Sequence, residues 1–449
     1  MKSPIRMSKQ RSSRTARWLR LSVIGAGLTS SAIAYKFALR YRDKVGLPHR
    51  SSVETSPAEF GLAFEQVEIP AGDRQLVGWF VPAEPEGEPK KARAGARTKA
   101  SAAAVEPTPA AAVLTAAPAA GTSPALPEPP DRRPAIVVVH GWESNRGRTF
   151  AHVRYLHAAG FHCLVFAVRG HGDSPEETLP INVPEFAEDT AAAARWAAAR
   201  PEVSTVGVLG HSMGGAGAIV AASHEPLIKA VVSASAPADL VRMTRKTFQM
   251  AGLQIPELIA TPLAWLTAAV LLIPRRHSVD DASATAAAAR YRGPLLLIHG
   301  AQDQGVPVAH LELIARAAVG GRGREGDPAV ETLVLPDFGH RWLYEDAGCR
   351  RKTATFFARS LGGPIAPATA GERAASCAVE RPADPIYGFG AAANKVPPHD
   401  RTATLDGPTE PAPGDLRPAT LRHTPTPLRR LEHGHLAGNR HNAGHPQVR

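Results

Sequence analysis

Six apolar runs recur along the middle of the chain, and segments with helical periodicity separate them. The runs are AIVVVHG, FHCLVFAVRG, VSTVGVLG, IKAVVSASA, GPLLLIHG and VETLVLPD. Unbroken hydrophobicity of this kind is typical of strands that are buried on both faces. Strands that alternate with helices, here for example Pro184–Ala199 and Met213–His224, indicate βαβ units. We therefore predict an α/β fold with a mostly parallel central sheet flanked by helices.

The segments around these runs predict the domain organisation. AFEQVEIP and QLVGWFVP alternate as two further strands joined by the turn AGDR, so the folded domain is expected to cover 51–361. Ala83–Arg133 is dominated by Ala, Pro, Glu and Lys and is expected to be a flexible insertion. Residues 237–292 are too long for one crossover helix and are expected to form a small helical lid. Residues 362–449, rich in Pro, Arg and His, are expected to be a largely disordered tail.

The positive charge of the chain lies at its N-terminus. Residues 1–50 hold twelve Lys or Arg and one Asp, a net of +11, which equals the net charge of all 449 residues. The rest of the chain is therefore neutral, and this distribution argues against a nucleic-acid-binding protein.

The N-terminal segment 1–50 is interpreted as a basic signal anchor and stalk. Leu21–Tyr35 is uncharged but shorter than the ~20 residues that span a bilayer comfortably, and snorkelling by Lys36 extends it to Leu39. Basic residues before it place the N-terminus inside and the folded domain on the extracytoplasmic side. Ala32-Ile33-Ala34 also allows secretion after cleavage near Ala34. An interfacial basic helix and a disordered basic extension stay open as alternatives, and so does a cytoplasmic location.

The candidate chemistry begins at GVLGHSMGG, where Ser212 stands between Gly210 and Gly214. An apolar strand precedes the serine and a small-residue helix follows it, so the serine is placed on a tight strand-to-helix turn. A serine nucleophile needs a base and an acid that orients the base. Asp303 and His340 follow two later strands, and the order Ser, Asp, His is the order this architecture requires.

Two backbone N–H groups are candidates for an oxyanion hole. Met213 begins the helix after the serine, and Trp142, in HGW, lies in the loop after an early strand. His140 is expected to support this loop rather than to react. Nothing in the core has the spacing of a metal or nucleotide site, so no cofactor and no metal are predicted. The cysteines Cys163, Cys349 and Cys377 are expected to be mainly buried small apolar residues.

These stretches resemble the α/β-hydrolase superfamily. VVVHGWESNR, AVRGHGDS, GHSMGG, SASAPADL, LLLIHGAQDQGVP and FGH carry the resemblance over about 57–361. GLAFEQVEIPAGDRQLVGWFVP is similar to the entry strands of bacterial, often membrane-anchored hydrolases of the serine esterase and aminopeptidase type. The resemblance implies Ser212 as nucleophile, His340 as base and Asp303 as acid.

The substrate is expected to be a small-molecule ester with an apolar acyl group. The lid sequence LIATPLAWLTAAVLLIP is interpreted as a lid helix, with Trp265 and Leu266 facing the substrate. A serine carboxylesterase is favoured, with a peptidase, aminopeptidase, acyltransferase or thioesterase on the same three residues as alternatives. A non-catalytic surface protein is a further alternative, motivated by the insertion, the basic N-terminus and the tail.

Overall fold

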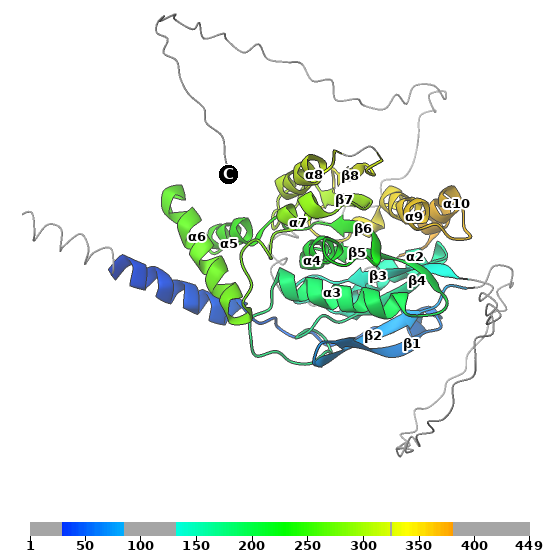
Figure 1. Cartoon of the computed structure of the whole chain (residues 1–449), viewed down its shortest axis with the longest axis horizontal. Coiled ribbons are helices and arrows are strands. Elements are labelled where there is room, and N and C mark those ends of the chain that lie inside the picture. Colours follow the sequence, from blue (N-terminus) through cyan, green and yellow to red (C-terminus); the bar gives the residue numbers. More distant parts are fainter. Residues whose placement is uncertain (1–28, 85–131, 324–325, 380–449) are drawn as a thin grey trace, which may run out of the picture. The chain divides into compact units, whose positions relative to one another are not determined.

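The structure is a computed structural model that describes residues 29–84, 132–323 and 326–379. The described residues contain an eight-stranded sheet in the order β1-β2-β4-β3-β5-β6-β7-β8 (Figure 1). Strands β1 and β2 pair antiparallel, β2 pairs antiparallel with β4, and all other neighbours are parallel. The predicted mostly parallel sheet is confirmed, and each predicted strand is present: β1 (Glu65–Ala71), β2 (Arg74–Val81), β3 (Arg133–Val139), β4 (His162–Phe166), β5 (Val203–His211), β6 (Ile228–Ala234), β7 (Leu295–Gly300) and β8 (Val330–Leu335).

Helices cover both faces of this sheet, which explains why its strands read as continuous apolar runs (Figure 1). Alternate residues of β3, such as Val137 and Val138, are fully buried in two different hydrophobic clusters. One cluster contains side chains of α3 (Val183–Ala198), α4 (Met213–Ala222), α7 (Ala284–Arg290) and α8 (Ala309–Gly321). The other contains side chains of α2 (Phe150–Ala158), α9 (Ala347–Leu361) and α10 (Pro367–Ser376). Short 3-10 turns complete the chain: η1 (Pro57–Phe60), η2 (Arg146–Thr149), η3 (Ile273–Arg275) and η4 (Leu343–Glu345).

The segment expected to be a lid, 237–292, contains two helices outside these layers. They are α5 (Leu240–Met250) and α6 (Glu257–Leu272), and they pack against each other. The third helix of the segment, α7, packs against α4 and α8 and belongs to the main helical layer. Helix α6 together with η3, Glu257–Arg275, is the one part of the described chain that is long and apolar enough to cross a membrane by length and composition.

A helix of residues 29–45, called the N-terminal helix below, packs onto α5 through its later half. Phe37 and Tyr41 both contact the ring of Phe248, with centroids 5.5 and 5.8 Å apart, and Ala38 is fully buried. Because residues 34, 37, 38, 41 and 45 repeat at helical spacing, one side of the helix faces the protein. The part of the predicted stalk from Phe37 onward is therefore packed against the folded domain.

The start of the predicted disordered tail is helical, which corrects that expectation for residues 367–376. Helix α10 packs against α9, with Ala370 and Ala374 fully buried. The guanidinium of Arg350 donates hydrogen bonds to the carbonyls of Ala374 and Ala375 at 3.0 and 2.6 Å, which satisfies the end of this helix. Most of the predicted insertion, most of the N-terminal anchor and the predicted tail from residue 380 onward lie outside the described residues.

Candidate active site

Ser212 occupies the turn between β5 and α4, with φ 55° and ψ −122°. A non-glycine residue rarely adopts a positive φ, so surrounding contacts must hold this strained turn. The two flanking glycines explain how. A Cβ on Gly210 would lie 2.2 Å from the carbonyl oxygen of Gly214, and a Cβ on Gly214 would lie 2.3 Å from that of His140. The turn therefore accepts only glycine at both positions, which accounts for the G-x-S-x-G pattern.

The structure brings Ser212, His340 and Asp303 together in one hydrogen-bonded chain. His340 lies after β8, and its Nε2 is 2.9 Å from the Ser212 Oγ. Its Nδ1 is 2.6 Å from the Asp303 Oδ2, and Asp303 lies after β7. With the Nδ1–H donating to the carboxylate, Nε2 is an acceptor for the serine hydroxyl. All three residues follow the carboxyl ends of strands, where loops of an open parallel sheet converge.

The Asp303 carboxylate is buried and held as an anion. Burial alone would raise its pKa, but hydrogen bonds from His299 and His340 and the charge of His340 outweigh burial and hold the pKa far below its usual range. The other carboxylate oxygen accepts hydrogen bonds from the N–H groups of Gly305 and Val306 at 3.0 and 2.8 Å. The carboxylate is therefore ionised at neutral pH.

Two histidines that the sequence analysis did not single out support this chain of groups. The Nε2 of His299 lies 3.3 Å from the Asp303 Oδ2 and 2.7 Å from the carbonyl oxygen of Val306. The Nε2 of His211 donates to the carbonyl oxygen of His340 at 2.8 Å. Burial, with the nearby charge of His340, lowers the pKa of His211 to about 3, so this imidazole stays neutral. The sequence could have indicated these two histidines only by their positions, because His299 ends a predicted strand and His211 directly precedes the serine.

The loop after β3 packs directly on the serine turn. A Cβ on Gly141 would lie 3.1 Å from the Ser212 Cβ, so this loop and the turn are in contact. His140 behaves as expected: its Nδ1–H donates to the carbonyl of Gly141 at 2.7 Å, and its Nε2 accepts from the N–H of Val168 at 3.0 Å. Burial lowers the pKa of His140 to about 4 and keeps it neutral. The loop thus carries Trp142 to the cavity that also contains Ser212.

Met213, the other candidate oxyanion donor, is the first residue of α4. The N–H groups of the first helical turn have no partner within their own helix, and the helix dipole adds partial positive charge there. Such N–H groups are suited to bind a developing negative charge next to Ser212.

The comparison with protein families agrees with this geometry. Residues 130–273, from β3 to the start of η3, match the family model described as serine aminopeptidase, S33. The described residues therefore have an α/β-hydrolase fold. No curated protein sequence matches it.

The chain is also similar to solved structures of esterases and peptidases. An esterase of Pyrococcus furiosus is 20% identical, with 71% of this chain and 98% of that chain covered and a TM-score of 0.49. An acetyl xylan esterase of Paenibacillus sp. R4 is 17% identical, with 69% and 88% covered and a TM-score of 0.43. An acylaminoacyl peptidase of Pyrococcus horikoshii is 17% identical, with 67% and 42% covered and a TM-score of 0.44.

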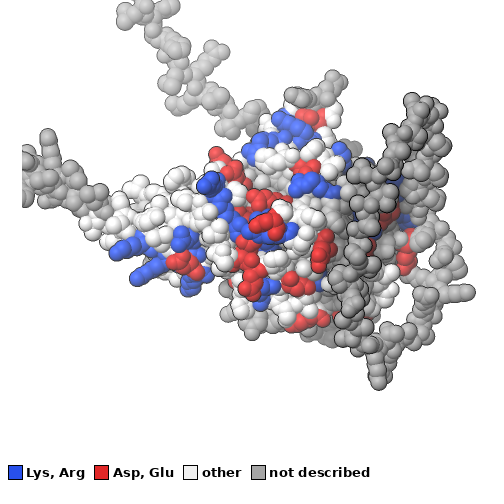
Figure 2. Space-filling view, turned by 60° about the horizontal axis from the view of Figure 1, so that its bottom comes forward, with Lys and Arg blue, Asp and Glu red and all other residues white. Residues whose placement is uncertain are grey.

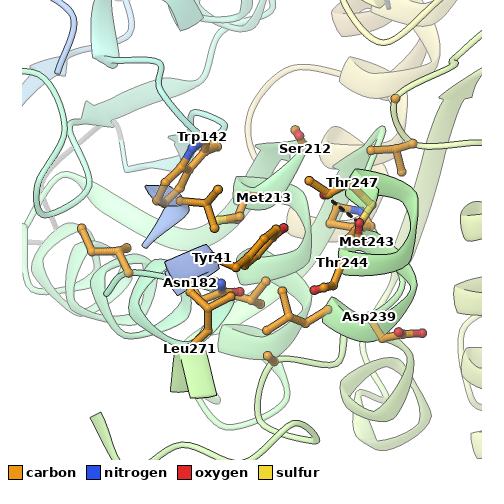
Figure 3. Close-up of a pocket in the computed structure, with 18 of the residues that line it drawn as sticks. Tyr41, Trp142, Asn182, Ser212, Met213, Asp239, Met243, Thr244, Thr247 and Leu271 are labelled. Carbon is orange, nitrogen blue, oxygen red and sulfur yellow. Dashed lines mark hydrogen bonds between the residues drawn. The ribbon is translucent and has the colours of Figure 1, made fainter. Parts of the chain in front are cut away.

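A largely apolar cavity of about 140 Å³ lies beside Ser212 (Figure 3). The loop after β3 and the turn after β5 supply Trp142 and Met213 to its wall. Helix α5 supplies Met243, and α6 supplies Leu271. The N-terminal helix supplies Tyr41, which the sequence analysis assigned to a stalk. Its helical stripe of apolar residues was the signal that could have identified it.

A second cavity of about 130 Å³ shares Ser212 and His340 with the first but has a more polar wall. Charged and aromatic side chains line it, among them Glu143, Arg148, His152, Arg341 and Trp342. Burial lowers the pKa of His152 to about 4, so this imidazole is neutral. The serine thus stands between an apolar and a polar cavity.

Trp265 and Leu266, expected to face the substrate, are not among the residues that line these two cavities. Trp265 is 57% exposed. The helical phase of α6 explains the difference, because Ala264, Ala268 and Leu271 face inward and place Trp265 on the outer side. The prediction for Trp265 and Leu266 is therefore corrected: α6 contributes Leu271 to the cavity wall instead.

Within the described ranges, no cluster of three or more His, Cys, Asp or Glu side chains could hold a metal ion. Cys163 and Cys349 are buried, in agreement with their expected role, and Cys377 is partly exposed. Arg169 and Asp173, in the loop after β4, form ion pairs within the fold: Arg169 pairs with the buried Asp189, and Asp173 pairs with Arg146.

Proposed function

We propose that the hydrolase is a serine carboxylesterase in which Ser212 is the nucleophile, His340 the general base and Asp303 the orienting acid. The observation that supports this most is the unbroken hydrogen-bonded chain from the Ser212 Oγ through both ring nitrogens of His340 to the Asp303 carboxylate. An isolated serine hydroxyl is a weak nucleophile, and an adjacent oriented base is what activates it.

The reaction starts with attack of the Ser212 Oγ on the ester carbonyl carbon, while the His340 Nε2 takes the hydroxyl proton. The carbonyl oxygen becomes an oxyanion, which the N–H groups of Met213 and Trp142 stabilise. When the tetrahedral intermediate collapses, His340 returns the proton to the departing alcohol and leaves an acyl group on the serine. A water molecule then attacks this acyl-enzyme with His340 again as base, and the acid is released.

The two cavities assign the two halves of the substrate. The apolar cavity, walled by residues such as Met243 and Leu271, suits an apolar acyl group. The more polar cavity suits the alcohol, which must exchange a proton with His340 and leave into water. Because Ser212 borders both cavities, an ester bound at the serine can place its acyl group in one cavity and its alcohol in the other.

An aminopeptidase is the second candidate, because the matched family model carries that description. An aminopeptidase substrate has a free ammonium group, which requires an available carboxylate near the serine. Asp239 is an acidic residue of the apolar cavity, but it caps α5 and accepts hydrogen bonds from the N–H and the guanidinium of Arg242. This engagement makes Asp239 a poor partner for an ammonium group in the apolar cavity, which supports an ester whose acyl group lies there.

A fluorophosphonate probe tests the nucleophile. The wild-type protein should be labelled and should hydrolyse p-nitrophenyl esters, whereas Ser212→Ala should do neither while melting at the same temperature. Ser223→Ala, at the far end of α4, is the matched control and should retain both properties. Parallel assays with aminoacyl p-nitroanilides separate esterase from aminopeptidase. Activity in Ser212→Ala would disprove the assignment.

We also propose that the N-terminal segment holds the enzyme at a membrane with the hydrolase domain on the extracytoplasmic side. The basic residues before Leu21 and the uncharged stretch to Tyr35 support this. Membranes from expressing cells should retain the protein in alkaline carbonate and release it in detergent. Release by carbonate would instead indicate a surface-bound helix, and a mature N-terminus after Ala34 would indicate secretion.

A further inference from the structure

The outer side of α6 is apolar where a surface helix is usually charged. Leu258 is 89% exposed and Trp265 is 57% exposed, and Pro262 lies exposed between them at helical spacing. The single charged residue of the helix, Glu257, pairs with Arg245 of α5. A helix that is apolar on all sides is normally buried in a protein or in lipid. Its exposed side therefore requires a covering partner.

The N-terminal helix lies on the same side of the molecule and adds two features to this surface (Figure 1). Its early residues Ile33 and Tyr35 are exposed, and so are Lys36, Arg40 and Lys44. Figure 2 shows Lys and Arg side chains beside an uncharged surface at the end of the molecule where this helix projects. The surface made by Ile33, Tyr35, Leu258, Pro262 and Trp265 is called the apolar rim below.

The sequence before residue 29 identifies the covering partner. LSVIGAGL, residues 21–28, has no charge, and residues 1–20 contain seven Lys or Arg and no acidic residue. Apolar side chains with aromatic residues and flanking cations are the combination that binds anionic bilayers. A second copy fits less well, because the net charge of +11 on residues 1–50 of each chain would oppose the pairing of two rims.

We propose that the apolar rim docks on an anionic lipid bilayer, as a contact additional to the N-terminal segment. Leu258 and Trp265 of α6 enter the headgroup region, and the cations of the N-terminal helix pair with lipid phosphates. Trp265, placed by its helical phase outside the substrate cavity, thereby acquires a role as an interfacial anchor.

The two helices that carry the rim also contribute side chains to the substrate cavity, and this arrangement suggests a substrate class. Tyr41 of the N-terminal helix and Leu271 of α6 line the cavity next to Ser212, so the two helices that present the rim also form the cavity wall. Docking thus holds the apolar cavity at the lipid surface. Resting on the proposed esterase activity, we infer that the physiological substrates are acyl esters dissolved in the bilayer.

The first experiment compares two presentations of the substrate. Full-length Leu258→Glu/Trp265→Glu protein is assayed with water-soluble p-nitrophenyl acetate and with p-nitrophenyl palmitate in phosphatidylglycerol–phosphatidylethanolamine vesicles. The soluble rate should match wild type, because both side chains lie outside the cavities, and the vesicle rate should fall about tenfold or more. Val319→Glu on α8 is the matched control. Val319 is 59% exposed, close to the 57% of Trp265, but it lies away from the rim.

Equal vesicle rates in the double variant and in wild type would overturn the proposal. So would a wild-type protein that is dimeric without lipid and becomes monomeric on the same two substitutions, since the partner would then be a second copy. If wild type hydrolyses neither ester and does not react with fluorophosphonate, the proposed esterase activity is wrong. Docking of the rim on the bilayer is then tested by a measurement that does not depend on catalysis.

That measurement is quenching of tryptophan fluorescence by vesicles whose acyl chains are brominated. Wild type should be quenched more than Trp265→Leu, while both bind vesicles through the N-terminal segment. Quenching that is unchanged in Trp265→Leu would show that Trp265 remains outside the bilayer and would overturn the proposal whatever the enzymatic result.

Discussion

A Cβ on Gly214 would lie 2.3 Å from the carbonyl oxygen of His140, which fixes the distance between two loops of the candidate active site. Gly214 follows the proposed nucleophile in α4, and His140 precedes the loop that carries Trp142. The close approach therefore sets the separation of the two proposed oxyanion donors. The atoms nearest to such a Cβ belong to the backbone of His140 and Val139, so the contact cannot be relieved by rotating a side chain.

Gly214→Ala should consequently damage both stability and catalysis. The added methyl group overlaps the carbonyl oxygens of His140 and Val139, at 2.3 and 2.6 Å, so the β3 loop must shift outward. We expect a loss of about 1–3 kcal/mol in the free energy of unfolding, as for an overpacked core. Ester hydrolysis should fall more than about tenfold because the oxyanion donors separate. Urea unfolding and p-nitrophenyl acetate kinetics measure the two effects.

The control for this substitution is Gly320→Ala in α8, where a Cβ meets no atom within 4 Å. It should leave kinetics unchanged and should not lower stability, since alanine favours a helix. Wild-type kinetics in Gly214→Ala would mean that the close contact does not set the oxyanion geometry.

The sheet and the groups of the candidate triad could be predicted because their signals are local. Apolar runs identify buried strands, and Ser212, Asp303 and His340 each follow one of them directly. Parallel strands bring their carboxyl ends to one edge, so sequence order alone places the three residues near each other. The structure adds what order cannot provide, the distances of 2.9 and 2.6 Å that connect them through hydrogen bonds.

The cavity wall could not be predicted, because it depends on how separate helices pack. Tyr41 reaches the cavity only because its helix packs on Phe248, 207 residues later in the chain. Trp265 faces outward because of the phase of α6, which is not apparent in a helix that is apolar on nearly all sides. Helix α10 was missed because its buried residues are two alanines and a glycine, which carry little hydrophobic signal.

Asp303→Asn should reduce turnover by about 10³–10⁴-fold, because an amide neither stabilises the imidazolium of His340 nor fixes its tautomer. Steady-state kinetics with p-nitrophenyl acetate measure the loss. Asp337→Asn, an exposed neighbour of His340 in sequence, is the control and should keep full turnover. A loss below about tenfold in Asp303→Asn would remove Asp303 from the proposed mechanism.

The stability of the same variant should depend on pH in a defined direction. Hydrogen bonds from His299 and His340 depress the folded-state pKa of Asp303 despite its burial. A depressed carboxyl pKa stabilises the fold above the unfolded pKa of about 4, and this stabilisation is lost as the pH falls toward the folded value. The difference in unfolding free energy between wild type and Asp303→Asn should therefore be constant from pH 5 to 7 and decrease below about pH 4. A flat difference across urea titrations in that acidic range would contradict the depressed pKa.

His277, just after η3, should stabilise the lid in the opposite pH direction. Its Nε2 lies 2.9 Å from the buried Glu185 Oε1, and this contact raises the pKa of His277, with further attraction from Glu188 and Asp281. A histidine whose pKa is raised by folding stabilises the folded state, and this contribution is complete below the pKa of the unfolded state, about 6.5. The contribution is lost as the pH rises through the pKa of the folded state.

The His277→Gln variant measures this contribution. Wild type should be more stable than His277→Gln by a few tenths to about 1 kcal/mol at pH 6, and the difference should shrink by pH 9. His224→Gln, an exposed histidine after α4, should show no such trend. An advantage of wild type that grows with pH would mean that His277 is neutral in the fold.

Tyr41 gives a direct test of whether the N-terminal helix forms the acyl site. Its ring lies against Phe248 with centroids 5.8 Å apart, and it lines the cavity with Ser212. Its hydroxyl contacts Thr247, and burial raises the pKa of this hydroxyl, so it stays neutral.

Tyr41→Trp should narrow the cavity and lower the ratio of kcat/KM for p-nitrophenyl octanoate over acetate about tenfold. Tyr41→Phe keeps the ring and should change this ratio less than about twofold, since only the hydroxyl contact is lost. Because a detached helix would leave both substitutions without effect, equal ratios in all three proteins would show that the helix is not part of the acyl site in solution.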